Sequence, residues 1–232
     1  MEMNLPEQMG YDRAMVVFSP EGRLFQIEYA KQAVDKGTTT IGIRYSAGVV
    51  LAAIKLVPEL FVADKHEKVF KIDEHIGATT CGIVADGRVL VDFARVKAQV
   101  NRLTYGEPIE ITSLVKEIAN RAQMFTQYAG IRPYGVSLLI GGRDDYPRLF
   151  ETDPPGTMKE WYAHALGRGS VAAKKILKRE YRQNMSRDAA IKLAIKALRA
   201  GEKSVNAKTL EIAIIEDKYK AFTPEEVKKA LS

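Results

Sequence analysis

Three histidines and a single cysteine are the side chains of this sequence best suited to bind a metal or act as nucleophiles. His66, His75 and His164 are isolated, and no Cys/His cluster of metal-site spacing exists. We therefore predict no metal site and no cofactor. Cys81 cannot form an internal disulfide, and its apolar surroundings predict a core residue rather than a reactive thiol.

A formal net charge of +6 and a pI near 9.2 make nucleic-acid binding a function to be tested. The basic residues are dispersed, and the densest group stands beside Glu180 on a helical pattern. That group is Lys174, Lys175, Lys178 and Arg179. Basic residues do not alternate with aromatic ones, as they do in proteins that bind single strands. The pattern favours a solvated helix face and predicts no nucleic-acid partner.

Length and hydropathy bound the class of protein. The 232 residues suit one large domain, and 46% hydrophobic with 28% charged residues is typical of a globular protein. No apolar run approaches the ~18 residues that span a bilayer, and residues 1–10 lack the features of a signal peptide. We expect a cytoplasmic protein with no membrane partner.

The elements that must position any site begin with an N-terminal segment. Residues 1–10 are polar and aperiodic, which predicts a flexible tail, and residues 14–18 are apolar and extended. Ser19-Pro20-Glu21-Gly22 predicts a turn, and a helix is expected over residues 23–34. Its apolar positions are Leu24, Ile27, Ala30 and Val34. A helix this short must dock on something to be stable.

The remaining chain alternates runs of strands with pairs of helices. Strands are expected at residues 38–44, 49–54, 68–72, 75–84, 134–140, 147–152, 158–166, 210–215 and 219–222. Turns are expected between consecutive strands, one of them at residues 141–145. Helices are expected after an N-cap at Asp86, from Thr112, at 171–181, at 187–200 and after Thr223. The helix after Asp86 has an apolar stripe that we expect to face the core: Val89, Phe93, Val96, Val100 and Leu103. This order predicts an α+β fold, a four-layer αββα sandwich of two antiparallel sheets.

Several motifs resemble the alpha subunits of the 20S proteasome, in their archaeal form. They are YDR at 11–13, FSPEGRLFQIEYA at 18–30, GTTTIG at 37–42, ADGRVL at 85–90, TQY at 126–128, RPYGVS at 132–137 and DPPG at 153–156. The resemblance covers nearly the whole chain in order. It implies the Ntn-hydrolase fold, which agrees with the predicted sandwich. It also divides the chain into a flexible gate tail at 1–10, an alpha-type segment with a turn and a docking helix at 11–34, and a sandwich at 35–232, which together form effectively one domain.

The catalytic beta subunits of that family use an N-terminal threonine as nucleophile, with its own amine as base. Thr38 resembles this threonine, but the chain continues before it, so its amine is blocked unless the peptide bond after Gly37 is cut. Ile54 stands where the beta subunits place an acid, and Lys68 resembles their lysine. The resemblance therefore implies a protein without catalytic residues. An active threonine peptidase is the alternative, and intact mass distinguishes the two.

The resemblance implies a structural and gating role instead. Alpha subunits form a seven-membered ring at each end of a barrel, against catalytic beta subunits, and dock a regulatory AAA+ ATPase ring of the proteasome-activating nucleotidase type through its C-terminal tails. Tyr11, Asp12, Pro20 and Tyr29 resemble the cluster that holds the gate open. Lys68, Glu28, Leu24, Gly37 and Gly82 resemble the activator-docking pocket between neighbouring alpha subunits.

Overall fold

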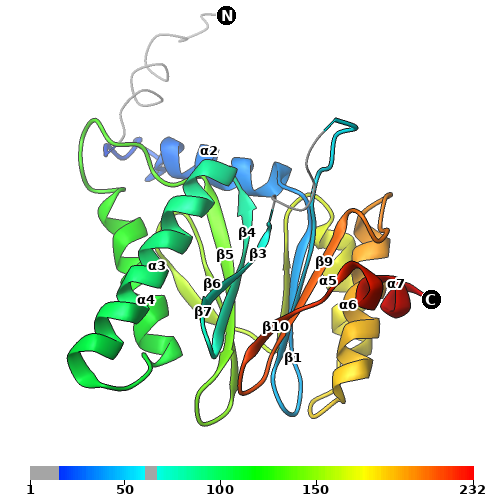
Figure 1. Ribbon diagram of the computed structural model, residues 1–232. Helices are drawn as coiled ribbons and strands as arrows, with labels where there is room; N and C mark the ends of the chain where they lie inside the picture. Colours follow the sequence, from blue (N-terminus) through cyan, green and yellow to red (C-terminus); the bar gives the residue numbers. More distant parts are fainter. Residues whose placement is uncertain (1–15, 61–66) are drawn as a thin grey trace, which may run out of the picture.

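Two antiparallel sheets form the centre of the fold (Figure 1). The computed structural model describes residues 16–60 and 67–232. One sheet has the strand order β10-β9-β2-β1-β8 and the other β3-β4-β5-β6-β7. The first contains β1 Thr40–Arg44, β2 Val49–Ile54, β8 Ala163–Leu166, β9 Leu210–Ile215 and β10 Tyr219–Ala221. The second contains β3 Val69–Asp73, β4 Ile76–Gly82, β5 Val136–Arg143, β6 Pro147–Thr152 and β7 Met158–Glu160.

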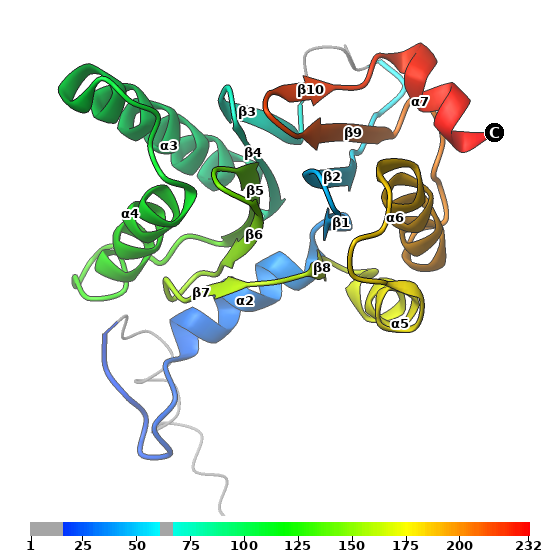
Figure 2. The same cartoon turned by 90° about the horizontal axis from the view of Figure 1, so that it is seen from below.

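A helix pair covers the outer face of each sheet, as the view from below makes plain (Figure 2). Helices α3 (Val84–Tyr105) and α4 (Ile111–Met124) pack on the β3–β7 sheet, and α5 (Ser170–Glu180) and α6 (Arg187–Gly201) on the other. Helix α2 (Phe25–Lys36) lies across one end of the sandwich against β4 and β5. Helix α7 (Pro224–Leu231) packs on α6 and β9. The predicted αββα sandwich is confirmed.

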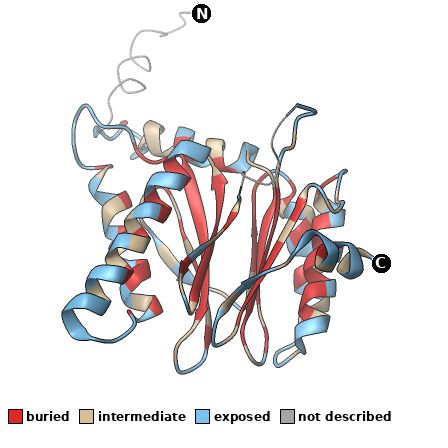
Figure 3. Cartoon of the chain, viewed as in Figure 1, coloured by how far each residue is buried: buried red, intermediate tan, exposed pale blue. Residues whose placement is uncertain are grey.

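Strand β2 shows why the sandwich has two sheets in contact. All six of its residues are buried, so both of its faces are covered. Val50, Ala52 and Ile54 pack in the cluster beneath α6, whereas Val49, Leu51 and Ala53 pack between the sheets. Side chains alternate across a strand, and an apolar run without alternation therefore marks a strand buried on both sides. Burial is concentrated in these inner layers (Figure 3).

The chain passes from one sheet to the other at Trp161 and Tyr162. The sequence pattern predicted one extended run over residues 158–166, but β7 pairs with β6 and β8 pairs with β1. The Trp161 N–H donates to Leu149 O at 2.8 Å, and the Arg44 N–H donates to Tyr162 O at 2.8 Å. Each of the two crossover residues is thus hydrogen-bonded to a different sheet.

Of the predicted core stripe of α3, Phe93 packs partly buried against the core, but the other four residues do not. Val89, Val96, Val100 and Leu103 are exposed, Leu103 at 87%, and the helix buries Leu90, Val91, Ala94 and Ala98 instead. Asp86 is not the N-cap either, because α3 begins two residues earlier at Val84.

The predicted turn at residues 141–145 also begins too early, because β5 continues to Arg143. Gly141 and Gly142 lie within the strand, where a Cβ would come within 2.6 Å of Val49 Cγ1 and of His75 O respectively. These glycines therefore serve close packing rather than a turn. The final helix does follow its prediction: Thr223 and Glu226 form a capping box, with Pro224 in the first turn.

Candidate functional site

Lys68 immediately precedes β3, and its ammonium reaches inward. Its Nζ donates to Thr38 O at 2.6 Å and to Ile54 O at 3.2 Å, and it also contacts Thr38 Oγ1. Burial lowers the pKa of Lys68 to about 8. Among the described residues, no carboxylate lies within 4.0 Å of this nitrogen. The side chain is a cation held by neutral oxygens.

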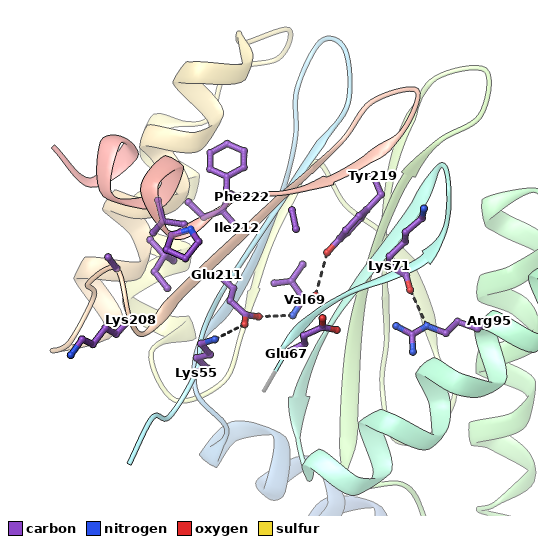
Figure 4. A pocket seen from close by; sticks show the side chains of 15 residues that line it. Lys55, Glu67, Val69, Lys71, Arg95, Lys208, Glu211, Ile212, Tyr219 and Phe222 are labelled. Atoms are coloured by element: carbon purple, nitrogen blue, oxygen red, sulfur yellow. Dashed lines mark hydrogen bonds and ion pairs between the residues drawn. The ribbon is translucent and has the colours of Figure 1, made fainter. Parts of the chain in front are cut away.

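The backbone of Lys68 is fixed by Glu211 on β9. The Glu211 carboxylate accepts from Lys68 N at 2.7 Å and Val69 N at 3.0 Å, and its other oxygen is 2.9 Å from Lys55 Nζ. Figure 4 shows Glu211 between Lys55 and Val69 in a cavity of about 630 Å³. The Tyr219 hydroxyl also donates to Val69 O at 3.2 Å. Side chains from β9 and β10 thus hold the start of β3, and with it Lys68.

Thr38 is joined to α2 without a break. Gly37 follows the helix directly, its N–H donates to Val34 O at 2.9 Å, and its carbonyl accepts from Arg168 N at 2.9 Å. A Cβ on Gly37 would lie 2.7 Å from Cys81 Sγ and 2.8 Å from Gly82 N, so only glycine fits at this position. The amine of Thr38 is a backbone amide in this arrangement.

A cavity of about 460 Å³ opens beside this junction. Lys68, Gly37 and Gly82 all line it, together with Thr38 and Arg168. Apolar side chains complete its wall: Ala33, Leu56, Phe70, Ile83 and Val84. The structure therefore brings three of the five residues predicted for the docking pocket to one place.

Leu24 and Glu28 lie elsewhere. They occupy the other end of α2, where Glu28 stands nine positions before Gly37, about 13 Å along the helix, and Leu24 is farther still. Glu28 forms an ion pair with Arg23 there. Within one chain these two residues are not part of the cavity.

The residues predicted for the gate are only partly described. Tyr11 and Asp12 lie outside the described residues. Pro20 lies in the predicted turn, which is closed by a hydrogen bond from Gly22 N to Ser19 O at 2.8 Å, with Gly22 at φ +75°. Tyr29 is 44% exposed on α2, and its ring stacks with that of Phe25.

A buried carboxylate next to the cavity was not predicted from the sequence. Glu202, after α6, accepts from Thr39 N at 2.9 Å and Thr39 Oγ1 at 2.8 Å, and from Arg168 Nη2 at 2.7 Å. Burial alone would raise the pKa of Glu202, but the hydrogen bonds from Arg168 and Thr39 hold it below its usual value. Arg168 and Glu202 come from separate loops, and no local pattern in the sequence links them.

Cys81 lies in the core beneath the cavity, as predicted. It is 1% exposed, and burial raises the pKa of its thiol to about 11. Within the described ranges, no group of three His, Cys, Asp or Glu side chains could hold a metal ion. None of the described helices has both the length and the apolar character to span a bilayer.

Comparison with known proteins identifies the class to which this fold and junction belong. The family model for proteasome subunits matches residues 34–215, and the model for the N-terminal signature of A-type proteasome subunits matches residues 11–33. The chain therefore belongs to the proteasome subunit family.

Similar proteins include alpha subunits from several archaea. The chain is 52% identical over 231 residues to the proteasome alpha subunit of Methanosarcina barkeri, covering 97% of this chain and 93% of the relative. It is 50% identical to those of Thermococcus sibiricus, covering 98% and 89%, and of Archaeoglobus fulgidus, covering 97% and 94%. The N-terminal signature and these relatives agree on the alpha type.

Proposed function

We propose that this chain is a non-catalytic structural and gating subunit of the 20S proteasome core in the cytoplasm. In this role it forms the outer seven-membered rings, assembles with catalytic beta subunits, restricts substrate entry and docks regulatory ATPases for protein degradation. The observation that carries the proposal is helix α2, which packs against β4 and β5 as part of the fold and leads directly through Gly37 into Thr38. The segment before Thr38 is thus packed on the sandwich, in the place where an active relative would have a free amine.

The surroundings of Thr38 support a protein without peptidase activity of its own. A threonine nucleophile of this type needs its own α-amine as base, and here that nitrogen is an amide. Ile54, at the position of the expected acid, offers Lys68 only a backbone carbonyl. The alternative, an active threonine peptidase, requires cleavage after Gly37. Intact mass tests this: the full chain should remain near 25.8 kDa.

The exposed face of α3 supports assembly with other subunits. Four apolar side chains lie in one stripe on this helix and remain exposed in the described part of the chain: Val89, Val96, Val100 and Leu103. An exposed apolar stripe of this length marks a protein–protein contact more often than a free surface. Native mass spectrometry of the chain expressed alone tests ring formation, and a species of seven chains is expected.

The cavity beside Lys68 supports docking of a C-terminal carboxylate. The Lys68 ammonium has no carboxylate partner among the described residues and can bind the C-terminal carboxylate of a partner. The apolar wall of the cavity can contact the partner's side chains that precede that carboxylate. Because Leu24 and Glu28 do not line this cavity, we assign them to a second half of the pocket. In a ring that half would belong to the neighbouring chain.

Replacing Lys68 with Ala tests the docking role. Degradation stimulated by the ATPase should fall, while ring assembly and basal peptide hydrolysis by the complete particle stay unchanged. Lys71→Ala is the matched control, because Lys71 lies on the adjoining strand but pairs with Glu74 at the surface. Normal stimulation of the Lys68→Ala particle would exclude the pocket.

Deletion of residues 2–12 tests the gate. These residues precede the Pro20 turn and α2, and we propose that they obstruct the ring axis, with Tyr11, Asp12, Pro20 and Tyr29 holding the open state. Particles built from the shortened chain should hydrolyse unstructured peptides faster than full-length particles. Equal rates would exclude a gating role for the segment.

A further inference from the structure

The hydrogen bonds of Lys68 suit a neutral amine as well as an ammonium. Thr38 O and Ile54 O can only accept, and both receive an N–H from Lys68 Nζ. The third partner is the Thr38 hydroxyl, which can accept a hydrogen bond or donate one. A neutral amine would donate to the two carbonyls and accept from the hydroxyl. Deprotonation of Lys68 therefore leaves each of these polar atoms with a partner.

The charges around Lys68 do little to keep it protonated. Glu202 is engaged by Arg168 and Thr39, and Glu211 by Lys55 and two backbone N–H groups. The Arg168 guanidinium lines the same cavity and opposes a second positive charge. Burial, the largest effect, lowers the pKa of Lys68 to about 8. Glu202 and Glu211 act in the opposite direction but are outweighed.

Lys55 and Cys81 provide internal comparisons. Lys55 lines the same cavity, but its Nζ forms an ion pair with the Glu211 carboxylate at 2.9 Å. The Cys81 thiol is buried, and its raised pKa keeps it protonated and unreactive at neutral pH. Of these three potential nucleophiles, Lys68 has both an open cavity and no carboxylate partner among the described residues.

We propose that Lys68 is a nucleophilic amine and a site of N-acylation by small acyl thioesters. The Nζ lone pair leaves the Thr38 hydroxyl and attacks the thioester carbonyl carbon, an amide C–N bond forms, the C–S bond breaks, and the thiolate leaves with its electron pair. The amine loses one proton, which the thiolate takes up. The cavity of about 460 Å³ leaves room for a short acyl chain beside the nitrogen. The product is a neutral amide.

Acylation would remove the cation from the cavity wall. If the docking role proposed above is correct, on which this consequence rests, the acylated protein would no longer attract a carboxylate. Lys68 would then connect the supply of activated acyl groups to activator docking. The chemical reactivity of Lys68 does not depend on that role and can be measured without any activator.

Limiting acetyl thioester provides the test. The full chain is treated at pH 7.5, and acetylation of each lysine is followed by peptide mass spectrometry. With a pKa of about 8, Lys68 is about one-quarter neutral at this pH, against roughly one part in a thousand for an unperturbed lysine. Allowing for the weaker nucleophilicity of a less basic amine, we expect Lys68 to react about tenfold faster than Lys55 or Lys71. Equal rates would overturn the proposal.

Two variants sharpen the result. Thr38→Val removes the hydroxyl but keeps the branched shape, and Lys68 should remain the fastest lysine. If the acyl group in the native chain instead appears on Thr38 as a hydroxylamine-labile ester, the assignment to Lys68 is wrong. Normal ATPase stimulation of the Lys68→Ala particle, with fast labelling of native Lys68, would refute docking but leave the acylation site standing.

Discussion

Glu202→Ala should destabilise the fold strongly, although Glu202 lies in a loop. Its side chain is 4% exposed and accepts from Thr39 N and Thr39 Oγ1, and Thr39 is fully buried. Loss of the acceptor leaves a buried N–H without a partner, at a cost of about 1–3 kcal/mol. The Arg168 side chain is 49% exposed and can return to water, so its lost ion pair adds less than about 1 kcal/mol. We expect a total loss of about 3 kcal/mol in the free energy of unfolding.

Urea unfolding followed by the fluorescence of the single tryptophan, Trp161, measures this change. Glu180→Ala is the matched control, because Glu180 pairs with Lys196 on the solvent-exposed surface, where an ion pair contributes little to stability. A loss below about 1 kcal/mol for Glu202→Ala would refute the reasoning, since a buried donor would then have found another partner.

The same carboxylate predicts a pH dependence. The pKa of Glu202 is lowered in the folded state, so its contribution is present above the unfolded value of about 4.3 and is lost as pH falls through the folded pKa. In Glu202→Gln this part of the acid sensitivity should be absent. If the unfolding free energy falls by the same amount between pH 6 and pH 3 in the native chain and in Glu202→Gln, the pKa of Glu202 is not lowered in the folded state.

Three further changes probe the fold and its surface. Thr223→Ala removes the capping box of α7 and should cost about 1 kcal/mol, with faster amide exchange confined to that helix. Gly82→Ala should prevent soluble folding, because Gly82 has φ +122° and a Cβ there would lie 2.2 Å from a carbonyl oxygen. Gly106→Ala, whose Cβ would lie in open space, should cost about 1 kcal/mol, and a similar loss of stability in both variants would refute the clash at Gly82. Leu103→Ser should change the unfolding free energy of the chain by less than about 0.5 kcal/mol but weaken assembly, whereas Leu90→Ala should cost roughly 2–5 kcal/mol. A larger loss of stability for Leu103→Ser than for Leu90→Ala would instead support the core face predicted from the sequence.

Most strands and helices could be predicted because their patterns reflect burial within this chain. The apolar patterns and flanking turns of β2, β6 and β9 predicted their bounds directly. The core face of α3 was predicted wrongly, because its strongest apolar stripe, with Val96 and Val100 at its centre, faces outward. Hydrophobic periodicity reports that a face is suited to contact, but not whether the contact is made within the chain or with another protein.

Asp86 illustrates a second limit. A carboxylate before a helical stripe resembles an N-cap, but this one forms a two-pronged ion pair with Arg132 at 2.6 and 2.7 Å and accepts from Gly135 N at 2.8 Å. These partners are distant in sequence, 46 residues away in the case of Arg132, beyond the reach of local capping rules. The pairing of Arg168 with Glu202 was missed for the same reason.

The cavity brings together three of the five residues of the proposed docking pocket. Lys68, Gly37 and Gly82 meet because β3, β4 and the end of α2 converge at one end of the sandwich. Leu24 and Glu28 were grouped with them by resemblance alone, and a single chain does not bring them together. Residues that act across an interface between chains carry no mark of it in the sequence of one chain.

The crossover at Trp161 and Tyr162 has a consequence for the order of folding. The sheet β3-β4-β5-β6-β7 is built from one continuous stretch, Val69 to Glu160, so a growing chain can complete it while synthesis continues. The other sheet joins β1 and β2 to strands that begin only at Ala163. These pairings span more than about a hundred residues and close slowly. During translation the outer edges of the β1–β2 hairpin therefore remain unpaired until β8 and β9 have been synthesised. We expect this half of the nascent chain to be the one most in need of a chaperone.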